Sequence, residues 1–337
     1  MDNLKLSYKE ENIMKIVIIA DEYKDISKGT IANNDMEGNS QEATEAIKKC
    51  VSEIADSILY TSIDDFCLNI QNHKNDIIFP IRYGTLSKTQ KGLIPAICEA
   101  NKLKYIGADC YAHILCNDKA LSKLYARQFG FFVPQHFIYR GEKNQQNILN
   151  HLKNLKLPLV IKPNFGGGSS GISTNNLVDR YDEAVELIIQ LYKLHHLPIM
   201  AEEYIPGEEV SLLIIGNEKQ INFFDTTQIE INKETLFNHW IWGFENKKID
   251  DSEMEYRMFN GLSENEKSKG VSLFQSFEKI DYMRIDGRVM DNTFYVLELS
   301  PDCYIGPDSD FAFAFRQNNK SYKDLIELII KNSLGLV

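Results

Sequence analysis

The sequence predicts an α/β protein whose N-terminal part contains a parallel sheet. Over residues 14–115, short apolar runs alternate with segments of helical apolar spacing, which is the pattern of parallel α/β units. From residue 207 onward, strand-like runs follow one another more closely and are separated by long polar insertions. These two observations predict a parallel unit that is followed, after a middle region, by an α+β region.

The first unit is expected to begin with a buried strand. Its strands are predicted in the apolar runs "KIVIIA", "NDIIFPIRYG" and "KYIG". Its helices are predicted in "SQEATEAIKKCVSEI", which begins with a serine suited to cap a helix, and in "GLIPAICEANKL". Residues 1–13 are expected to form a solvated extension, because they lack the basic region and apolar core of a signal peptide.

Two further units are expected over residues 116–206 and 207–337. In the middle unit, helices are predicted in "DKALSKLYARQFG" and "YDEAVELIIQLYKL", and strands in "QHFIYR", "LPLVIKP", "GIST" and "IMAEEYI". In the last unit, the strand "EEVSLLIIGN" is followed by two strand-like runs around the turn "GRVMDNT" and by a final helix, "SYKDLIELIIKNSL".

The composition excludes several classes of function. The chain has 337 residues, of which 43% are hydrophobic and 25% charged, so it can bury a substantial core. Its net charge of −11 argues against a general nucleic-acid binder, and no apolar run approaches the length of a membrane span. The six cysteines form no CxxC pair and the seven histidines show no zinc spacing, which predicts reduced thiols in a cytoplasmic protein.

The stretch "VIKPNFGGGSSGIS" ends an apolar run on Lys162 and continues as a glycine-rich loop. Bare backbone amides in such a loop can fold around an anion, and phosphate is the obvious candidate. A flexible hairpin turn is the alternative, since glycine and serine also form loose turns. The stretch is not a Walker A loop, because its lysine precedes the glycines, and it is not a dinucleotide fingerprint, because no helical pattern opens at its last glycine.

Two carboxylates near the C-terminus, Asp286 and Glu298, lie on strand-like runs that a turn joins. On such a hairpin both side chains can reach one face, and a carboxylate pair among apolar strands requires a cation. Oxygen ligands of this kind suit Mg²⁺ that bridges to phosphates. A surface hairpin with incidental acids is the alternative interpretation. Taken alone, Lys119 and Lys162 are more typical of solvated surface lysines.

Taken together and in this order, the segments resemble the ATP-grasp superfamily, and within it the D-alanine–D-alanine ligases. The resemblance covers nearly the whole chain and rests on the strings "YIGADCYAHILCNDKALSKLYARQFGFFVP", "LPLVIKPNFGGGSSGIS", "EEYIPGEEVSLLIIG", "RIDGRV" and "VLELSPD". It implies an ATP-grasp fold with an N-terminal substrate domain over 14–115, a central subdomain over 116–206 and a C-terminal subdomain with the metal and catalytic site over 207–337. The glycine-rich loop then corresponds to the family's phosphate-covering loop.

The resemblance also implies roles for individual residues. The residues matching those that hold the phosphates of ATP are Lys119, Lys162 and Ser169, with the Ser169 amide at the γ-phosphate. Gly168 of the same loop is also expected to bind ATP, although it replaces a family serine that contacts substrate. The residues matching the adenine-pairing hinge are Glu202, Glu203 and Ile205, and the residue matching the ribose ligand is Glu209. The residues matching the magnesium ligands, for which Mn²⁺ is an alternative metal, are Asp286 and Glu298, and Ser300 stands at the expected third ligand position. Arg284 matches the arginine that stabilises the tetrahedral intermediate.

The implied activity is that of an ADP-forming carboxylate–amine ligase. A carboxylate attacks the γ-phosphate of ATP to give an acyl phosphate, and an amine then attacks the acyl carbon and releases phosphate. The expected partners are small-molecule carboxylate and amine substrates, ATP and Mg²⁺. No nucleic acid and no membrane are expected as partners, and a homodimer is the expected assembly.

Departures from the family pattern concentrate on the substrate side. Ser300 stands where the family has a metal-binding asparagine, and Asp302 is the alternative ligand. Arg82 falls near the expected donor substrate, and Ser309 falls where the family binds the carboxylate of the acceptor. The tyrosine and lysine of the family's mobile loop have only candidates here, which are Trp240, Trp242 and Lys247.

These departures leave three hypotheses open. An active ligase for an amino acid or small carboxylate other than D-alanine is favoured, because the nucleotide and metal residues and Arg284 are retained. An authentic D-alanine–D-alanine ligase with a diverged pocket is the second. The third is a nucleotide-binding pseudoenzyme that acts as a regulator, and Ser300 is its main support.

Overall fold

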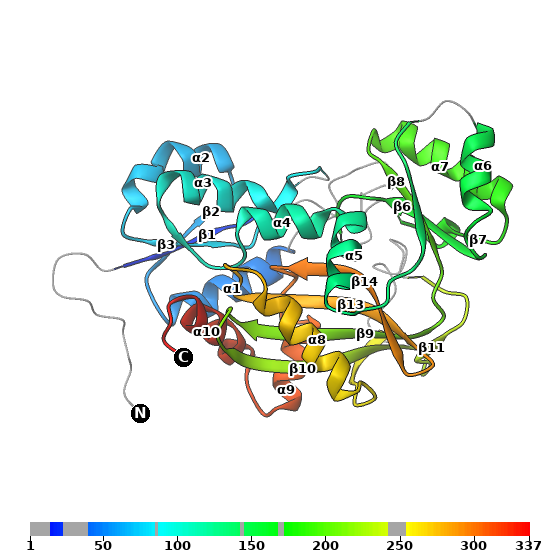
Figure 1. Ribbon diagram of the computed structural model, residues 1–337. Helices are drawn as coiled ribbons and strands as arrows, with labels where there is room; N and C mark the ends of the chain where they lie inside the picture. Colours follow the sequence, from blue (N-terminus) through cyan, green and yellow to red (C-terminus); the bar gives the residue numbers. More distant parts are fainter. Residues whose placement is uncertain (1–13, 23–39, 85–86, 142–144, 168–171, 242–253) are drawn as a thin grey trace.

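Three β-sheets organise the described part of the chain in the computed structural model (Figure 1). The structure describes residues 14–22, 40–84, 87–141, 145–167, 172–241 and 254–337. The predicted α/β class is confirmed, because a parallel sheet near the N-terminus is followed by two antiparallel sheets. None of the described helices is long and apolar enough to cross a membrane.

The N-terminal sheet has four parallel strands in the order β2-β1-β3-β4. Its side chains alternate between two apolar layers: Ile16 and Ile18 face helix α1, whereas Val17 and Ile19 face helices α2 and α3. Helix α1 begins at the predicted cap, where Ser40 Oγ accepts the Ala43 N–H at 3.1 Å. The elements are β1 (Ile16–Ile19), α1 (Gln41–Ser52), β2 (Ser57–Tyr60), α2 (Ile63–Asn69), β3 (Ile77–Pro80), α3 (Leu93–Asn101) and β4 (Lys104–Tyr105).

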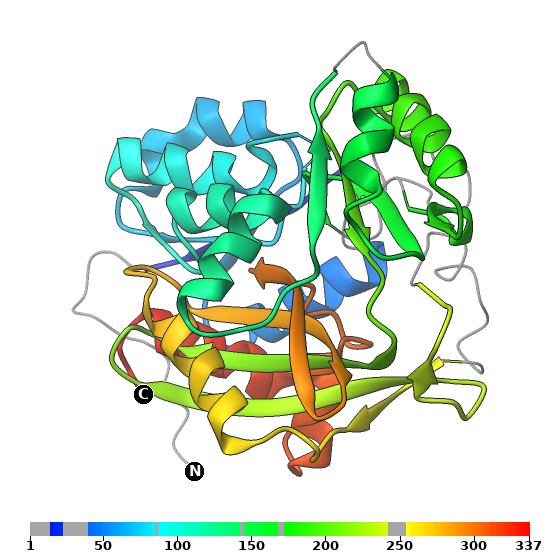
Figure 2. The same ribbon diagram turned by 45° about the vertical axis from the view of Figure 1, so that its right-hand side comes forward.

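The central sheet is antiparallel, in the order β5-β8-β6-β7, and has an apolar core of its own. Two helices, α6 and α7, cover one face of it (Figure 2). The predicted strand at "GIST" is wrong for its described residues, because Ser173 bonds to Asn176 in a 3-10 turn and the strand starts only at Leu177. The elements are β5 (His136–Tyr139), α6 (Gln145–Leu152), β6 (Leu159–Pro163), β7 (Leu177–Val178), α7 (Tyr181–His195) and β8 (Ile199–Glu203).

The C-terminal sheet has the order β12-β10-β9-β13-β14, and a short strand, β11, also pairs with β9. The turn between β13 and β14 is tighter than the sequence suggested. The strands run to Met290 and from Thr293, and Asp291 and Asn292 both adopt positive φ between them. The strands are β9 (Gly207–Gly216), β10 (Ile221–Ile231), β11 (Leu236–Phe237), β12 (Met254–Met258), β13 (Tyr282–Met290) and β14 (Thr293–Pro301).

Five helices pack on this sheet and join it to the rest of the molecule. Helices α4 and α5 lie against β14, and their apolar residues share a core with α8. Helices α9 and α10 share another core with the N-terminal sheet, so the first and last parts of the chain form one packed body. The helices are α4 (Cys110–Asn117), α5 (Lys119–Gln128), α8 (Glu264–Gln275), α9 (Asp310–Gln317) and α10 (Tyr322–Ser333), and the 3-10 turns are η2 (Ile70–His73), η3 (Gln90–Gly92) and η4 (Thr174–Asn176).

Gly207 connects the central sheet to β9 and generates the first prediction. Its φ is +131°, and a Cβ there would overlap the backbone carbonyl of Val289 on β13. We therefore expect Gly207→Ala to lower the free energy of unfolding by about 2–4 kcal/mol in urea titration. Gly130→Ala is the control, because Gly130 also has positive φ (+80°) but meets only the flexible end of Lys269 at 3.6 Å. The control should cost about 1–2 kcal/mol, and equal losses in both variants would contradict the close approach.

Candidate active site

Charged side chains from distant parts of the chain meet where α5 and the central sheet approach β14. Lys119 Nζ on α5 lies 3.6 Å from Glu298 Oε1 on β14. Lys123, one turn further along α5, donates to the carbonyl of Leu297 at 2.6 Å. In Figure 1, α5 stands next to β13 and β14, and β6 and β8 of the central sheet lie above and to the right of it.

Glu202 on β8 is a deeply buried acid of this region, with 3% of its side chain exposed. Its carboxylate forms ion pairs with Lys123 at 3.0 Å and with Lys162 on β6. Both lysines are buried as well. Burial alone would raise the pKa of Glu202, but the attraction of Lys123 and Lys162 holds it well below its usual range.

Lys123 is a member of the site that sequence reasoning missed. Burial lowers the pKa of Lys123 to about 8. Glu202 opposes this shift only in part, because its one carboxylate is shared by two buried ammonium groups. The signal was present in the sequence: Lys123 follows Lys119 by four residues, so both side chains lie on one face of the same helix. Neither an isolated lysine nor its spacing, however, reveals that Glu202 lies opposite.

Lys119 stands at the first turn of α5, beside the start of the glycine-rich loop. Asp118 caps the helix by accepting the N–H groups of Ala120 and Leu121, both at 3.1 Å. Asn164 donates to the same carboxylate at 2.8 Å. The Lys119 ammonium donates to the carbonyl of Gly166, so Lys119 and the end of β6 are held side by side.

Asp286 and Glu298 are directly opposed cross-strand partners on β13 and β14. Asp286 Oδ1 accepts a hydrogen bond from Ser211 Oγ on β9 at 2.7 Å and lies 2.7 Å from Arg284 Nε. Ser300 Oγ is 3.3 Å from Asp286 Oδ2. The structure therefore brings together all four residues that the sequence analysis expected on this hairpin, and Ser211 joins them.

The charges of this cluster are balanced unevenly. Burial raises the pKa of Asp286, and repulsion from Glu298 adds to it, while Arg284 opposes the shift. Burial also acts to raise the pKa of Glu298, but Lys119 and Lys162 outweigh it and lower that pKa. Arg284 is shared with Asp310 on α9, whose Oδ2 lies 3.1 Å from Nη1. Of the pair, Asp286 is thus the acid whose charged form its surroundings stabilise less.

The carboxylate pair fits a magnesium ion better than a fully protein-built metal cage. Within the described ranges, no three His, Cys, Asp or Glu side chains lie close enough to form such a cage. Mg²⁺ usually takes one or two protein carboxylates and completes its shell with water and substrate phosphates. Asp286 and Glu298, with the Ser300 hydroxyl beside them, match that donor set.

The Asp302 carboxylate, the alternative ligand to Ser300, is engaged away from the carboxylate pair. Its carboxylate accepts the Ala108 N–H at 3.0 Å and lies 2.9 Å from His113 Nε2 on α4. Residue 302 follows the end of β14 with a φ of +46°, so the chain has left the sheet there. Asp302 consequently stabilises the junction with α4, and Ser300 is the residue beside the carboxylate pair.

The end of β8 and the residues after it are where the adenine-pairing hinge is expected. The Glu202 side chain serves the lysine cluster, and the Glu203 carboxylate accepts the Lys156 N–H at 2.8 Å near the surface. Ile205 is buried. Glu209 lies on β9, where its Oε2 is 2.7 Å from Arg288 Nη2 on β13, a partner that no local pattern predicts.

The substrate-side residues are only partly described. Arg82 follows β3, and its Nε lies 3.4 Å from Asp21, which follows β1. Ser309 caps α9 by accepting the Ala312 N–H at 3.2 Å. Trp240 is described and lies near the hinge, where its N–H donates to the Tyr204 hydroxyl at 3.0 Å. Residues of the sequence analysis that fall outside the described ranges are Gly168, Ser169, Trp242 and Lys247.

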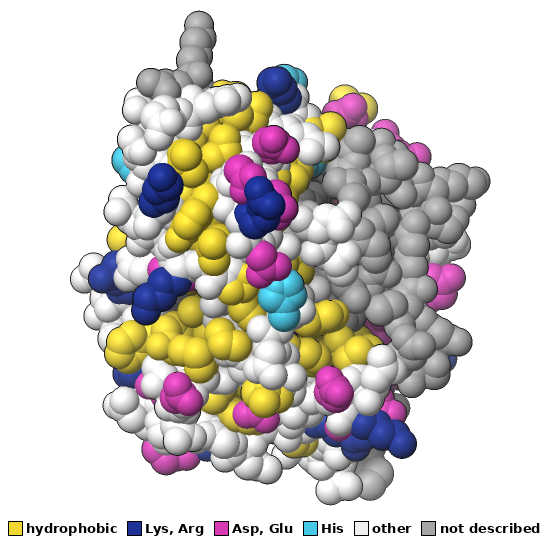
Figure 3. Space-filling view, turned by 90° about the vertical axis from the view of Figure 1, so that its right-hand side faces the viewer, with side chains coloured by type: hydrophobic (Ala, Val, Ile, Leu, Met, Phe, Trp, Pro, Cys, Tyr) yellow, Lys and Arg dark blue, Asp and Glu magenta, His cyan; other side chains and the backbone are white. Residues whose placement is uncertain are grey.

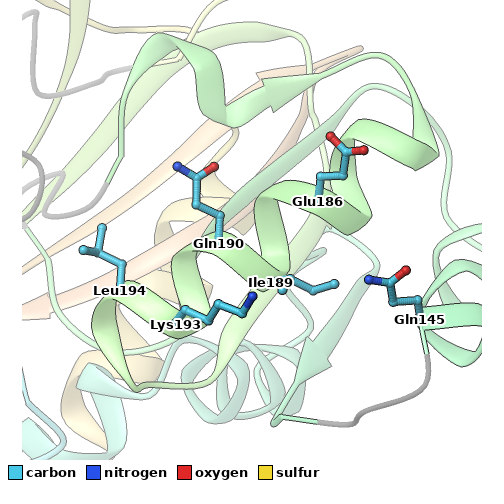
Figure 4. A pocket seen from close by; sticks show the side chains of 6 residues that line it. All are labelled: Gln145, Glu186, Ile189, Gln190, Lys193 and Leu194. Carbon is cyan, nitrogen blue, oxygen red and sulfur yellow. The ribbon is translucent and has the colours of Figure 1, made fainter.

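A surface hollow of about 550 Å³ lies apart from these clusters. It is formed by α7 and the start of α6 (Figure 4), on a side of the molecule where apolar and charged side chains are interspersed (Figure 3). Its lining residues are Gln145, Glu186, Ile189, Gln190, Lys193 and Leu194. None of the candidate site residues is among them, so the hollow has no evident part in the chemistry.

The chain resembles one family of known proteins over most of its length. The family model described as D-ala D-ala ligase C-terminus matches residues 126–331. The D-alanine–D-alanine ligase of Thermotoga sp. (strain RQ2) is 21% identical over 295 residues, which cover 86% of this chain and 90% of that protein.

Solved structures show the same architecture. The D-alanine–D-alanine ligase from Bacillus anthracis complexed with ATP superposes with a TM-score of 0.69 at 20% identity, covering 97% of this chain and 98% of that one. The VanG D-Ala:D-Ser ligase from Enterococcus faecalis gives a TM-score of 0.70 at 16% identity, covering 96% and 100%. The ATP-grasp fold expected from the sequence is thereby confirmed.

The lysine cluster around Glu202 generates the second prediction. Glu202→Gln leaves Lys123 and Lys162 buried without a counter-charge, so we expect the free energy of unfolding at pH 7 to fall by about 3–5 kcal/mol. The deficit should shrink as the pH rises. Unpaired buried lysines have a native pKa below their unfolded one, so the native state then binds fewer protons and gains stability with increasing pH. Urea titrations between pH 6 and pH 9 measure both effects.

Glu203→Gln is the matched control for this prediction, because the neighbouring carboxylate lies near the surface and accepts a single backbone N–H. The control should change stability by less than about 1 kcal/mol at every pH. A Glu202→Gln deficit that stays constant between pH 6 and pH 9 would contradict the proposed origin of the loss in two unpaired lysines.

Proposed function

The chain belongs to the D-alanine–D-alanine ligase family, and from this premise we propose that it is an ADP-forming ligase that joins a carboxylate to the amine of an amino acid. ATP supplies the activation, and the substrates are small molecules. The finer part of the proposal is that the preferred carboxylate is not D-alanine.

One observation carries the proposal. Three segments that are far apart in the sequence bring cations and carboxylates to the same place: Lys119 of α5, Lys162 of β6 and the Asp286–Glu298 pair of β13 and β14. Cations are needed where phosphate oxygens bind, and carboxylates where a metal bridges them. A purely structural ion-pair network would not need two directly opposed carboxylates.

In the proposed first step, the donor carboxylate attacks the γ-phosphorus of ATP, the bond to ADP breaks and an acyl phosphate forms. Lys119 and Lys162 hold the phosphates and offset the charge that moves to the leaving ADP. Glu202 keeps Lys162 in place, and Lys123 shares that carboxylate. Gly168 and Ser169 are proposed to cover the phosphates from the glycine-rich loop.

Mg²⁺ is the proposed metal, and Asp286, Glu298 and Ser300 are the residues proposed to hold it. When bound, it neutralises charge on the phosphate oxygens during transfer. The Ser211 hydroxyl contributes by orienting the Asp286 carboxylate through its 2.7 Å hydrogen bond.

In the proposed second step, the amine attacks the acyl carbon and the amide forms. Phosphate leaves with the electron pair of the acyl C–O bond and takes up the proton that the amine nitrogen loses. Arg284 stabilises the oxyanion that develops on the acyl oxygen. Asp286 and Asp310 bind two positions of its guanidinium, at 2.7 and 3.1 Å, and so orient the group before substrate arrives. Ser309, the residue before Asp310, is proposed to receive the carboxylate of the acceptor.

Arg82 supports a donor that is larger or more acidic than alanine. Arg82 and Asp21 follow neighbouring parallel strands, β3 and β1, at their carboxyl ends. Ligands of parallel α/β sheets bind at that edge. Asp21 accepts the N–H groups of Tyr83 and Gly84 at 2.7 and 3.0 Å. Because the same carboxylate pairs with the Arg82 guanidinium, that guanidinium is held at the expected substrate side.

The third prediction tests the metal ligands. Glu298→Gln keeps the size of the side chain while removing its charge, and 29% of that side chain is exposed, so the variant should fold. We expect ATP turnover to fall by at least about a hundredfold, because the metal loses one of its two carboxylates. Phosphate release in the presence of Mg-ATP and substrate measures this.

The matched control is Glu255→Gln, which removes an exposed carboxylate from β12 of the same sheet. It should leave turnover within about twofold of the unmodified protein. Full turnover in Glu298→Gln, with the control unchanged, would remove Glu298 from the proposed metal site.

The fourth prediction concerns the substrates. When the protein is incubated with Mg-ATP and pairs of amino acids and small carboxylates, we expect slow phosphate release with D-alanine alone. Release should be faster with an extended or acidic carboxylate paired with an α-amino acid, because Arg82 pairs with its charge. Arg82→Met should lower the rate with the acidic carboxylate by about tenfold and leave the rate with D-alanine unchanged.

Mass detection of the product separates the alternatives. D-alanyl-D-alanine as the preferred product in a competition assay would instead support the hypothesis of an authentic D-alanine–D-alanine ligase. If no pair releases phosphate although Mg-ADP binds, the pseudoenzyme becomes the better description.

A further inference from the structure

Arg288 on β13 is a buried cation that neither of the proposed chemical steps uses. Only 4% of its side chain is exposed, yet it belongs to the strand that carries Arg284 and Asp286. A buried guanidinium is costly unless its donors are engaged. Its contacts therefore indicate what it holds in place.

Those contacts join three separate parts of the chain. Nη2 lies 2.7 Å from Glu209 Oε2 on β9 and donates to the carbonyl of Trp240 at 3.0 Å. Nη1 is 3.3 Å from the Tyr204 hydroxyl and 3.4 Å from the Gly207 carbonyl. The guanidinium is thus bound by the hinge after β8, by β9 and by the segment after β11.

Aromatic rings complete the surroundings of this guanidinium. Its central carbon lies 5.5 Å from the ring centre of Tyr204 and 5.4 Å from that of Phe237. The Tyr204 hydroxyl in turn donates to the Phe237 carbonyl at 2.9 Å and accepts the Trp240 N–H at 3.0 Å. Tyr204 and Arg288 together fasten residues 237–240 onto the hinge.

The strand register places Arg288 and Glu209 next to the proposed metal site. Asp286 is opposite Ser211 and Arg288 is opposite Glu209, with no irregularity between β13 and β9. Residues two apart on a strand share a face and lie about 7 Å from each other. Glu209 therefore lies about 7 Å along β9 from Ser211, the residue opposite Asp286. One nucleotide can span such a distance between its phosphates and its sugar.

We propose that Arg288 is the positioning residue of the nucleotide sugar site. It holds the Glu209 carboxylate so that its second oxygen faces the ribose hydroxyls, and it ties residues 237–240 against the hinge beside that sugar. This inference rests on the proposed function, in which Glu209 receives the ribose. Glu209 keeps 20% of its side chain exposed, whereas Arg288 is enclosed, so the acid contacts the ligand and the arginine acts through it.

The test compares the binding of Mg-ADP with that of Mg-2′-deoxyADP and Mg-3′-deoxyADP by calorimetry, which requires no knowledge of the other substrates. The unmodified protein should favour ADP by roughly tenfold over a deoxy analogue, because a lost hydroxyl leaves a carboxylate oxygen unpaired. Glu209→Gln should bring the ratio close to one. Arg288→Met should also lower the ratio by at least about fivefold, and the double variant should show no further loss.

Two further variants control for structural damage. Arg257→Met removes a half-exposed arginine that also pairs with carboxylates on this sheet, and it should leave the ratio unchanged. Arg288→Lys keeps one positive charge for Glu209 but cannot span the Trp240 and Tyr204 contacts, so it should restore part of the ratio. If Arg288→Met does not fold in a urea titration, the ratio measured for Arg288→Lys decides.

The outcomes distinguish this inference from the proposed function. Equal losses of ADP and deoxyADP affinity in the Arg288 variants, with the ratio unchanged, would overturn the positioning role. Failure of the unmodified protein to bind Mg-ADP at all would instead contradict the proposed ligase.

Discussion

The buried carboxylate of Glu202 is the interaction on which the arrangement of the site depends. Helix α5 shares its apolar core with the C-terminal sheet, whereas β6 and β8 belong to the separate core of the central sheet. Glu202 pairs with Lys123 from the first body and with Lys162 from the second. Because a buried carboxylate and two buried lysines are tolerated only together, this contact fixes how the two bodies meet.

The antiparallel register of the C-terminal sheet arranges the remaining groups. Arg284, Asp286 and Arg288 alternate with apolar neighbours along β13 and thus share one face. Opposite them on β9 stand Leu213, Ser211 and Glu209. A one-residue slip between these strands would turn every one of these side chains to the other face. The long, unbroken pairing of β9 with β13 is therefore a requirement of the chemistry as well as of the fold.

Much of this could be predicted from the sequence, and the remainder has a physical reason. Local patterns predicted the helix cap at Ser40 and the strands that carry Lys162 and Asp286, because a cap and a strand both depend on residues that are close in the chain. The pairing of Glu202 with Lys123 and that of Arg288 with Glu209 join residues 79 positions apart in each case, and no local pattern encodes them. The strand predicted at "GIST" is wrong for residues 172–174 for another reason: Ser173 and Asn176 bond to each other at a 3-10 turn.

The division of the cores also indicates which part of the molecule can move. The N-terminal sheet shares its core with α9 and α10, so the Arg82 edge and the Arg284 cluster are fixed to one body. The central sheet contacts that body through polar groups at the site itself, including Lys119 with Gly166 and Arg288 with Tyr204. Polar contacts are weaker restraints than a shared apolar core. We therefore expect the central sheet to be the part that shifts when the site is occupied, within the limits that the Glu202–Lys123 pair sets, while the substrate edge stays in place.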